Sequence, residues 1–195
     1  MEKGKSLSAI LRSDKTVFSS KDIALLWHES NTTATRVRLH YFIKKGDLVR
    51  IRKGLYAKNK NYNKLELATR ILTPAYVSFE TVLAKEGLIF QYYDTIFVAS
   101  YVKREIIIDQ QVYSFRRMKD SILTDSMGIT HVNETSIATK ERAFLDTLYV
   151  NVDYHFDNLR SLEWEKVFEM LPIYENQRMI KKANGLYKRI NQKIP

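Results

Sequence analysis

A basic stripe runs along one side of the helix that the sequence predicts over residues 33–45, TATRVRLHYFIKK. Residues three or four positions apart share one helical face, and four residues follow this spacing: Thr33, Arg36, His40 and Lys44. Arg38 lies on the flank of the stripe. No acidic residue occurs from Ser30 to Gly46, whereas a face that only keeps a protein soluble normally mixes both signs. Side chains of this kind on one helix face are suited to contact the bases and phosphates of DNA.

The residues that follow, LVRIRKGLYA at 48–57, predict a two-stranded hairpin with a Lys53-Gly54 turn. Arg50 and Arg52 are two positions apart, which places them on the same face of a regular strand. A charged edge also protects a hairpin from pairing with other strands, but that role needs fewer than three cations. We therefore expect Arg50, Arg52 and Lys53 to reach phosphates or a minor groove.

The elements around these residues predict a winged helix-turn-helix. An amphipathic helix is expected over residues 5–13, and Ser19 and Asp22 form a capping pair at the start of a second helix. Gly46 ends the third helix. The predicted core residues of that third helix are Thr35, Leu39, Phe42 and Ile43. Three helices, a tight turn and a hairpin would place the third helix in the major groove, with Thr33 and Arg36 nearest the base edges.

A polar joint, KNKNYN at 58–63, separates this part of the chain from the rest. We expect a DNA-binding domain over residues 1–60 and a mixed α/β domain with a helical C-terminus over residues 61–195. Within the second domain, Ser78 is the expected cap of a helix that follows a strand. The predicted fold class is therefore α+β.

The net charge of +10 is concentrated at the two ends of the chain. Residues 1–60 hold 14 Lys and Arg against 5 Asp and Glu, and every charged residue after Glu175 is basic. Residues 61–175 are acidic on balance. Positive charge gathered in this way indicates a polyanionic partner, usually a nucleic acid. The basic terminal helix fits two roles, as an ordinary solvated helix or as a further contact along DNA.

Composition and motifs exclude several classes of protein. The absence of Cys excludes disulfides and thiolate metal sites and favours a reducing cytosol. The N-terminus, MEKGKSLSAI, has no apolar core of a signal peptide, and the apolar stretch TIFVASYV is too short to cross a bilayer, so we expect a soluble cytoplasmic protein. The glycines form no phosphate-binding loop and the histidines have no metal-ligand spacing, so no cofactor, metal or catalytic residue is expected.

Two other functions fit the same residues. One is a protein that neutralises a partner by direct contact, with incidental DNA binding, but the charge distribution favours DNA. The other is a metal-dependent enzyme acting on nucleic acid, which would need folding to assemble Asp109, Asp125 and Asp146. The acidic residues are not clustered in sequence, and a helix surface or first turn accounts for Glu80, Glu141 and Asp146.

Three stretches form an ordered set over roughly residues 5–150: LHYFIKKGDLVRIRKGLYA, AYVSFETVLAKEGLI and SIATKERAFLDTLY. The first joins a helix and Gly to a hairpin ending in Gly-x-Tyr, and the second is a strand, Ser, helix and Gly. In order and spacing the three resemble the AbiEi family of antitoxins, from bacterial abortive-infection toxin–antitoxin systems. The family's third motif often has Pro where this chain has Lys140, and both residues suit the first helical position.

The resemblance implies a non-enzymatic antitoxin of a type IV toxin–antitoxin system, with a role in phage resistance. The N-terminal winged helix-turn-helix would repress its own operon by binding inverted repeats in double-stranded promoter DNA. The protein would be a monomer in solution, and two or more protomers would bind the inverted repeats. The C-terminal domain would counteract a nucleotidyltransferase-like toxin without forming a stable complex with it. No membrane partner is implied.

Overall fold

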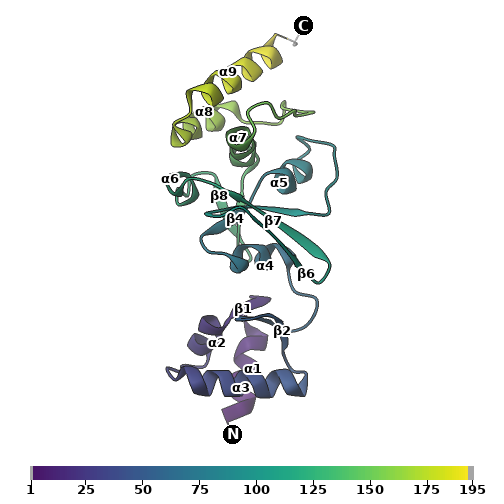
Figure 1. The fold of residues 1–195 in the computed structure, drawn as a ribbon, viewed down its shortest axis with the longest axis vertical. Coiled ribbons are helices and arrows are strands. Elements are labelled where there is room, and N and C mark those ends of the chain that lie inside the picture. Colours follow the sequence, from purple (N-terminus) through teal and green to yellow (C-terminus); the bar gives the residue numbers. More distant parts are fainter. Residues whose placement is uncertain (1, 193–195) are drawn as a thin grey trace. The chain divides into compact units, whose positions relative to one another are not determined.

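The chain folds into two compact units of mixed helix and strand, one up to Ile71 and one from Leu72 onward (Figure 1). The computed structural model describes residues 2–192. Helices and strands occur in both units, which confirms the predicted α+β class. Within the described part of the chain, no helix combines the length and the apolar character needed to cross a membrane.

The first unit contains helices and a small sheet. Its helices are α1 (Glu2–Arg12), α2 (Ser20–Leu26), α3 (Thr32–Lys45) and α4 (Lys64–Ile71). Its strands are β1 (Val17–Ser19), β2 (Val49–Arg52) and β3 (Leu55–Ala57). Strand β3 lies between β1 and β2 and pairs antiparallel with both, so the predicted hairpin gains a third strand that the sequence did not indicate.

The core of the first unit fixes the orientation of α3. Leu39 and Phe42 are buried against Trp27, and Ile43 packs against the same cluster. Thr35 is also buried, so the predicted inner face of α3 is confirmed. The complete buried cluster is Ile10, Phe18, Ile23, Trp27, Leu39, Phe42 and Leu48.

Local capping interactions set the start of α2 and both ends of α3. The Ser19 hydroxyl accepts from the Asp22 amide at 3.1 Å, and the Ser19 amide donates to the Asp22 carboxylate at 2.8 Å, which confirms the predicted capping pair. Asn31 caps α3 by accepting from the amides of Thr33 and Ala34. Gly46 ends α3 in the left-handed region, at φ 83°.

Helix α4 belongs to the first unit, although the predicted boundary after residue 60 assigned it to the second. The Glu66 carboxylate is almost fully buried and accepts hydrogen bonds from the backbone amides of Thr16 and Val17, at 2.9 and 3.2 Å. Arg70 donates to Glu66 at 3.2 Å and to Asp22 at 3.0 Å. These contacts join α4 to β1 and α2, so the compact unit extends to Ile71.

The second unit is built on a six-stranded mixed sheet in the order β6-β7-β5-β4-β9-β8. Its strands are β4 (Ala75–Val77), β5 (Ile96–Ser100), β6 (Arg104–Ile108), β7 (Gln111–Arg117), β8 (Ile129–Val132) and β9 (Thr135–Ala138). The β5–β7 and β4–β9 pairs are parallel and the other pairs are antiparallel.

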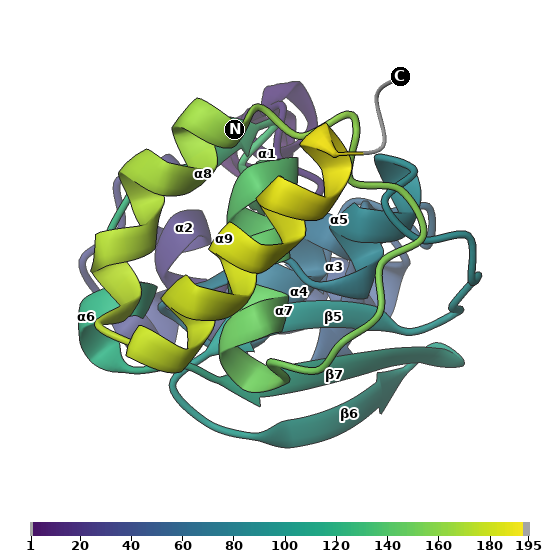
Figure 2. The ribbon, with the colours of Figure 1, turned by 90° about the horizontal axis from the view of Figure 1, so that it is seen from above.

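Helices lie along one side of this sheet (Figures 1 and 2). The helices of the second unit are α5 (Glu80–Lys85), α6 (Asp120–Leu123), α7 (Lys140–Val150), α8 (Trp164–Met170) and α9 (Gln177–Asn191), with a short 3-10 turn at Leu171–Tyr174. Helix α7 packs against α5, α8 and β9. Every residue of α7 from Glu141 to Leu148 is buried, so this helix is the centre of the second unit.

The predicted cap of α5 is wrong. Phe79, not Ser78, precedes the helix, and no side chain caps it. Phe79 has a positive φ of 55°, a conformation that is uncommon for a bulky residue. The Ser78 hydroxyl instead donates to Asp146 of α7 at 2.7 Å, so it serves the core of the second unit rather than the end of a helix.

Candidate nucleic-acid interface

The outer face of α3 carries the predicted stripe. Thr33, Arg36, His40 and Lys44 are all exposed. Two apolar side chains lie among them, Val37 and Tyr41, which are 66% and 41% exposed. Neither side chain was predicted to be exposed, because apolar residues in a helix usually face the core. Val37 and Tyr41 lie four and eight positions after Thr33, and this spacing, which places all three residues on one face, was the available signal.

Arg38 has partners inside the first unit. Its guanidinium lies 5.3 Å from the centre of the Trp27 ring and 3.8 Å from the Glu29 carboxylate. It also donates to the Ser6 hydroxyl at 3.4 Å. Only 24% of its side chain is exposed, so Arg38 helps to join α3 to α1 and to the segment that follows α2, whereas the four residues of the stripe are exposed.

The hairpin carries its three predicted cations in different settings. Arg50 and Lys53 are exposed, whereas Arg52 is half-buried. Arg50 lies opposite Tyr56 and Arg52 lies opposite Leu55, so the register shifts between the two arginines. This irregularity invalidates the argument that a spacing of two places them on one face, because that argument assumes a regular strand.

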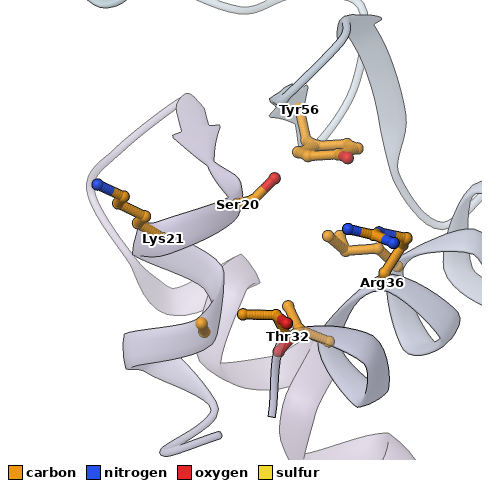
Figure 3. A pocket seen from close by; sticks show the side chains of 8 residues that line it. Ser20, Lys21, Thr32, Arg36 and Tyr56 are labelled. Atoms are coloured by element: carbon orange, nitrogen blue, oxygen red, sulfur yellow. The ribbon is translucent and has the colours of Figure 1, made fainter. Parts of the chain in front are cut away.

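A pocket of about 240 Å³ lies between α2, α3 and β3 (Figure 3). We call it the α2–α3 pocket; its lining consists of Ser20, Lys21, Ala24, Thr32, Thr35, Arg36, Leu39 and Tyr56. Ser20, Thr32, Arg36 and Tyr56 surround one space, whereas the ammonium end of Lys21 points away from it in this view. Arg36 therefore belongs both to the exposed stripe and to the pocket beside it.

The second unit holds a fully buried ion pair that the sequence analysis did not predict. Arg142 and Asp146 of α7 have no exposed side-chain surface, and the Arg142 Nε donates to an Asp146 oxygen at 3.4 Å. Arg142 also donates to the carbonyl oxygens of Met127 and Ile122, at 2.7 and 2.6 Å. Glu80 and Glu141 lie in the first turns of α5 and α7, as expected, but both are buried, as is Asp146.

Hydroxyl groups complete the surroundings of Asp146. Tyr174 and Ser78 donate to its two oxygens, both at 2.7 Å, and Tyr76 donates at 3.2 Å. Burial raises the pKa of the Asp146 carboxyl, and the Arg142 guanidinium and the hydroxyl donors oppose that rise. Burial and then the Asp146 charge raise the pKa of Tyr76 and Tyr174 well above the ordinary value. Both hydroxyls therefore keep their protons and remain donors to the carboxylate.

This cluster is a structural centre rather than a metal site. Among residues 2–192, no three or more His, Cys, Asp or Glu side chains are arranged to hold a metal ion. Asp109, Asp125 and Asp146 therefore do not form the site that a metal-dependent enzyme would need. A charge that is buried and fully paired is instead well suited to fix one arrangement of α7 against the sheet.

Comparisons with known proteins find a similarity of fold to a solved structure. No protein-family model matches the chain, and no curated protein matches it. The crystal structure of the RV2827C protein from Mycobacterium tuberculosis is similar, with a TM-score of 0.48 and 10% sequence identity. The match covers 94% of this chain and 71% of that chain.

Proposed function

We propose that the protein is a sequence-specific DNA-binding repressor whose first unit is a winged helix-turn-helix. The observation that carries this proposal is the outer face of α3, which is exposed and free of acidic residues from Ser30 to Gly46. The basic hairpin β2–β3 follows directly in the chain. In a winged helix-turn-helix, α3 would lie in the major groove and the hairpin would be the wing.

Six of the exposed residues divide into two groups on this proposal. Thr33, Val37 and His40 lie along the middle and start of α3, where side chains reach base edges. Lys44 at the end of α3, with Arg50 and Lys53 on the hairpin, would hold phosphates. Arg52 would contribute its charge from a half-buried position. Arg38 would hold α3 in place through its contacts within the first unit rather than contact DNA.

We further propose that the repressor is an antitoxin of the AbiEi type, acting on inverted repeats in its own promoter. Support comes from the three motifs, and two of them meet in the second unit. Ser78 of the second motif and Arg142 and Asp146 of the third form the buried cluster. These motif residues would maintain the fold, so the surface that counteracts a nucleotidyltransferase-like toxin would lie elsewhere on the second unit.

Footprinting on the DNA upstream of the gene tests this function. Two protected half-sites are expected, in inverted orientation and with centres separated by about one helical turn or a multiple of it. Protection that spreads evenly along the DNA, with no preferred sites, would contradict a sequence-specific repressor.

Val37 is expected to recognise a thymine methyl group. We predict that replacing one thymine of a half-site by uracil weakens wild-type binding by about 0.8 kcal/mol, the value of one buried methyl group. The same replacement should have no effect on Val37→Ala, because the contact is already lost. Leu11→Ala, which removes another exposed apolar side chain of the first unit, is the control. Equal uracil effects in wild type and Val37→Ala at every position would exclude this contact.

Lys53 is expected to contact a phosphate without reading sequence. Lys53→Ala should weaken binding to all duplexes alike and lower the slope of log K against log salt by about 1. The measurement is a salt titration of DNA affinity, with Lys85→Ala as the control, since Lys85 is an exposed lysine of α5 in the second unit. An unchanged slope for Lys53→Ala would remove the hairpin turn from the interface.

A further inference from the structure

The α2–α3 pocket gathers polar side chains that have no partner among the residues that the structure describes. Arg36, Ser20, Thr32 and Tyr56 line it, and their side-chain polar groups make no hydrogen bond or ion pair with any residue that the structure describes. The buried side of the pocket is made by Thr35 and Leu39. Small-ligand sites commonly combine an apolar base with a few converging polar groups.

The chemistry of these groups selects an anion that also carries hydroxyl or ether oxygens. One guanidinium and four hydroxyls line the pocket, and none of its eight lining residues is acidic. One of the hydroxyls, that of Thr35, already donates to the Asn31 carbonyl oxygen at 3.1 Å. A guanidinium forms paired, charge-assisted hydrogen bonds with phosphate oxygens, and hydroxyl groups add further donors. The volume of about 240 Å³ leaves room for more than a bare phosphate. We propose that the α2–α3 pocket binds a phosphate group carried on a sugar.

Two sources supply this chemistry. The first is the backbone of DNA, and this alternative rests on the proposed function. Arg36 would then bind a phosphate beside the residues of α3 that contact bases. This changes the role that the sequence suggested for Arg36, which was to contact a base edge. The second source is a free sugar phosphate, which would occupy Arg36 and oppose DNA binding.

Single methylphosphonate substitutions test the DNA source, because each removes the charge of one phosphate. The full-length protein is titrated with a promoter duplex carrying one substitution at a time. At one position in each half-site, neutralisation should weaken wild-type binding by about tenfold. At that position, the loss of affinity from neutralisation and the loss from Arg36→Gln should be far from additive, and the same should hold for Tyr56→Phe. Lys44→Gln is the matched control on the same helix and should be additive there.

Chemical-shift titration of the full-length protein tests the free source, with 2-deoxyribose 5-phosphate as the probe at constant ionic strength. A free ligand would be identified by saturable chemical-shift changes in the pocket residues, with an affinity that Arg36→Gln and Tyr56→Phe each weaken by about fivefold or more. Inorganic phosphate and deoxyribose alone should bind more weakly. The proposal would be overturned if the losses of DNA affinity were additive at every phosphate and 2-deoxyribose 5-phosphate showed no saturable binding. If the protein shows no preference for promoter DNA, the proposed function fails, and the sugar phosphate titration alone decides the pocket.

Discussion

Asp146→Ala is expected to destabilise the second unit by about 3–5 kcal/mol, because removal of one partner leaves a buried charge uncompensated. Arg142 would remain fully buried next to Tyr76 and Tyr174, whose hydroxyls would lose their acceptor. The guanidinium cannot shed its proton to escape this cost. A loss of this size is a large part of the stability of an ordinary domain.

Urea denaturation followed by hydrogen exchange measures this effect for each unit separately. Asp153→Ala is the matched control, since Asp153 pairs with Arg178 and Lys182 but its side chain is 73% exposed. We expect that control to change the unfolding free energy by less than about 1 kcal/mol. Asp146→Asn provides a milder variant that keeps an acceptor for the hydroxyls. Both Asp146 variants within 1 kcal/mol of wild type would show that the buried pair does not hold the second unit together.

Arg36→Ala is expected to weaken binding to promoter DNA by about 1.5–3 kcal/mol, the usual value of hydrogen bonds to a charged group. Arg36 is exposed and has no partner among the described residues, so its removal should leave the first unit folded. If the α2–α3 pocket holds a backbone phosphate, the loss should be the same for the promoter and for its single-base variants. Val37→Ala should instead alter the preference at one base pair.

Affinity measured across a set of single-base operator variants separates these outcomes. Lys45→Ala is the control for charge alone, since Lys45 lies at the end of α3 and pairs with Asp47 at 3.4 Å. A change of base preference in Arg36→Ala would show that Arg36 contacts a base edge and that the pocket does not bind a DNA phosphate. If Arg36→Ala bound promoter DNA with wild-type affinity, the proposed contact between α3 and DNA would be wrong.

Helical periodicity predicted the outer face of α3 because its inner residues, Thr35, Leu39, Phe42 and Ile43, recur at helical spacing. Leu39 and Phe42 fix the rotation of the helix, and Arg36 and His40 are then necessarily exposed. The hairpin followed from its Lys53-Gly54 turn. Its register shift was not predictable, because an irregularity between Arg50 and Arg52 leaves no mark in the alternation of residue types.

The buried pair of α7 was missed for the opposite reason. Arg142 and Asp146 have the spacing of a surface ion pair, and charged residues are seldom fully buried. Only the packing of α7 between α5, α8 and β9 reveals that this helix has no solvent face along most of its length. The α2–α3 pocket likewise joins Ser20, Arg36 and Tyr56, which are too distant in sequence to be associated from the chain alone.

The most direct test of a DNA-binding function is fluorescence anisotropy of the DNA upstream of this gene, compared with a scrambled duplex of the same length. The titration is made at low and at near-physiological salt, since electrostatic attraction alone weakens steeply as salt rises. Our account predicts that the native duplex binds more tightly than the scrambled one and that this preference persists at physiological salt. Equal binding of the two duplexes that disappears as salt rises would contradict it, because the basic residues would then provide only nonspecific attraction.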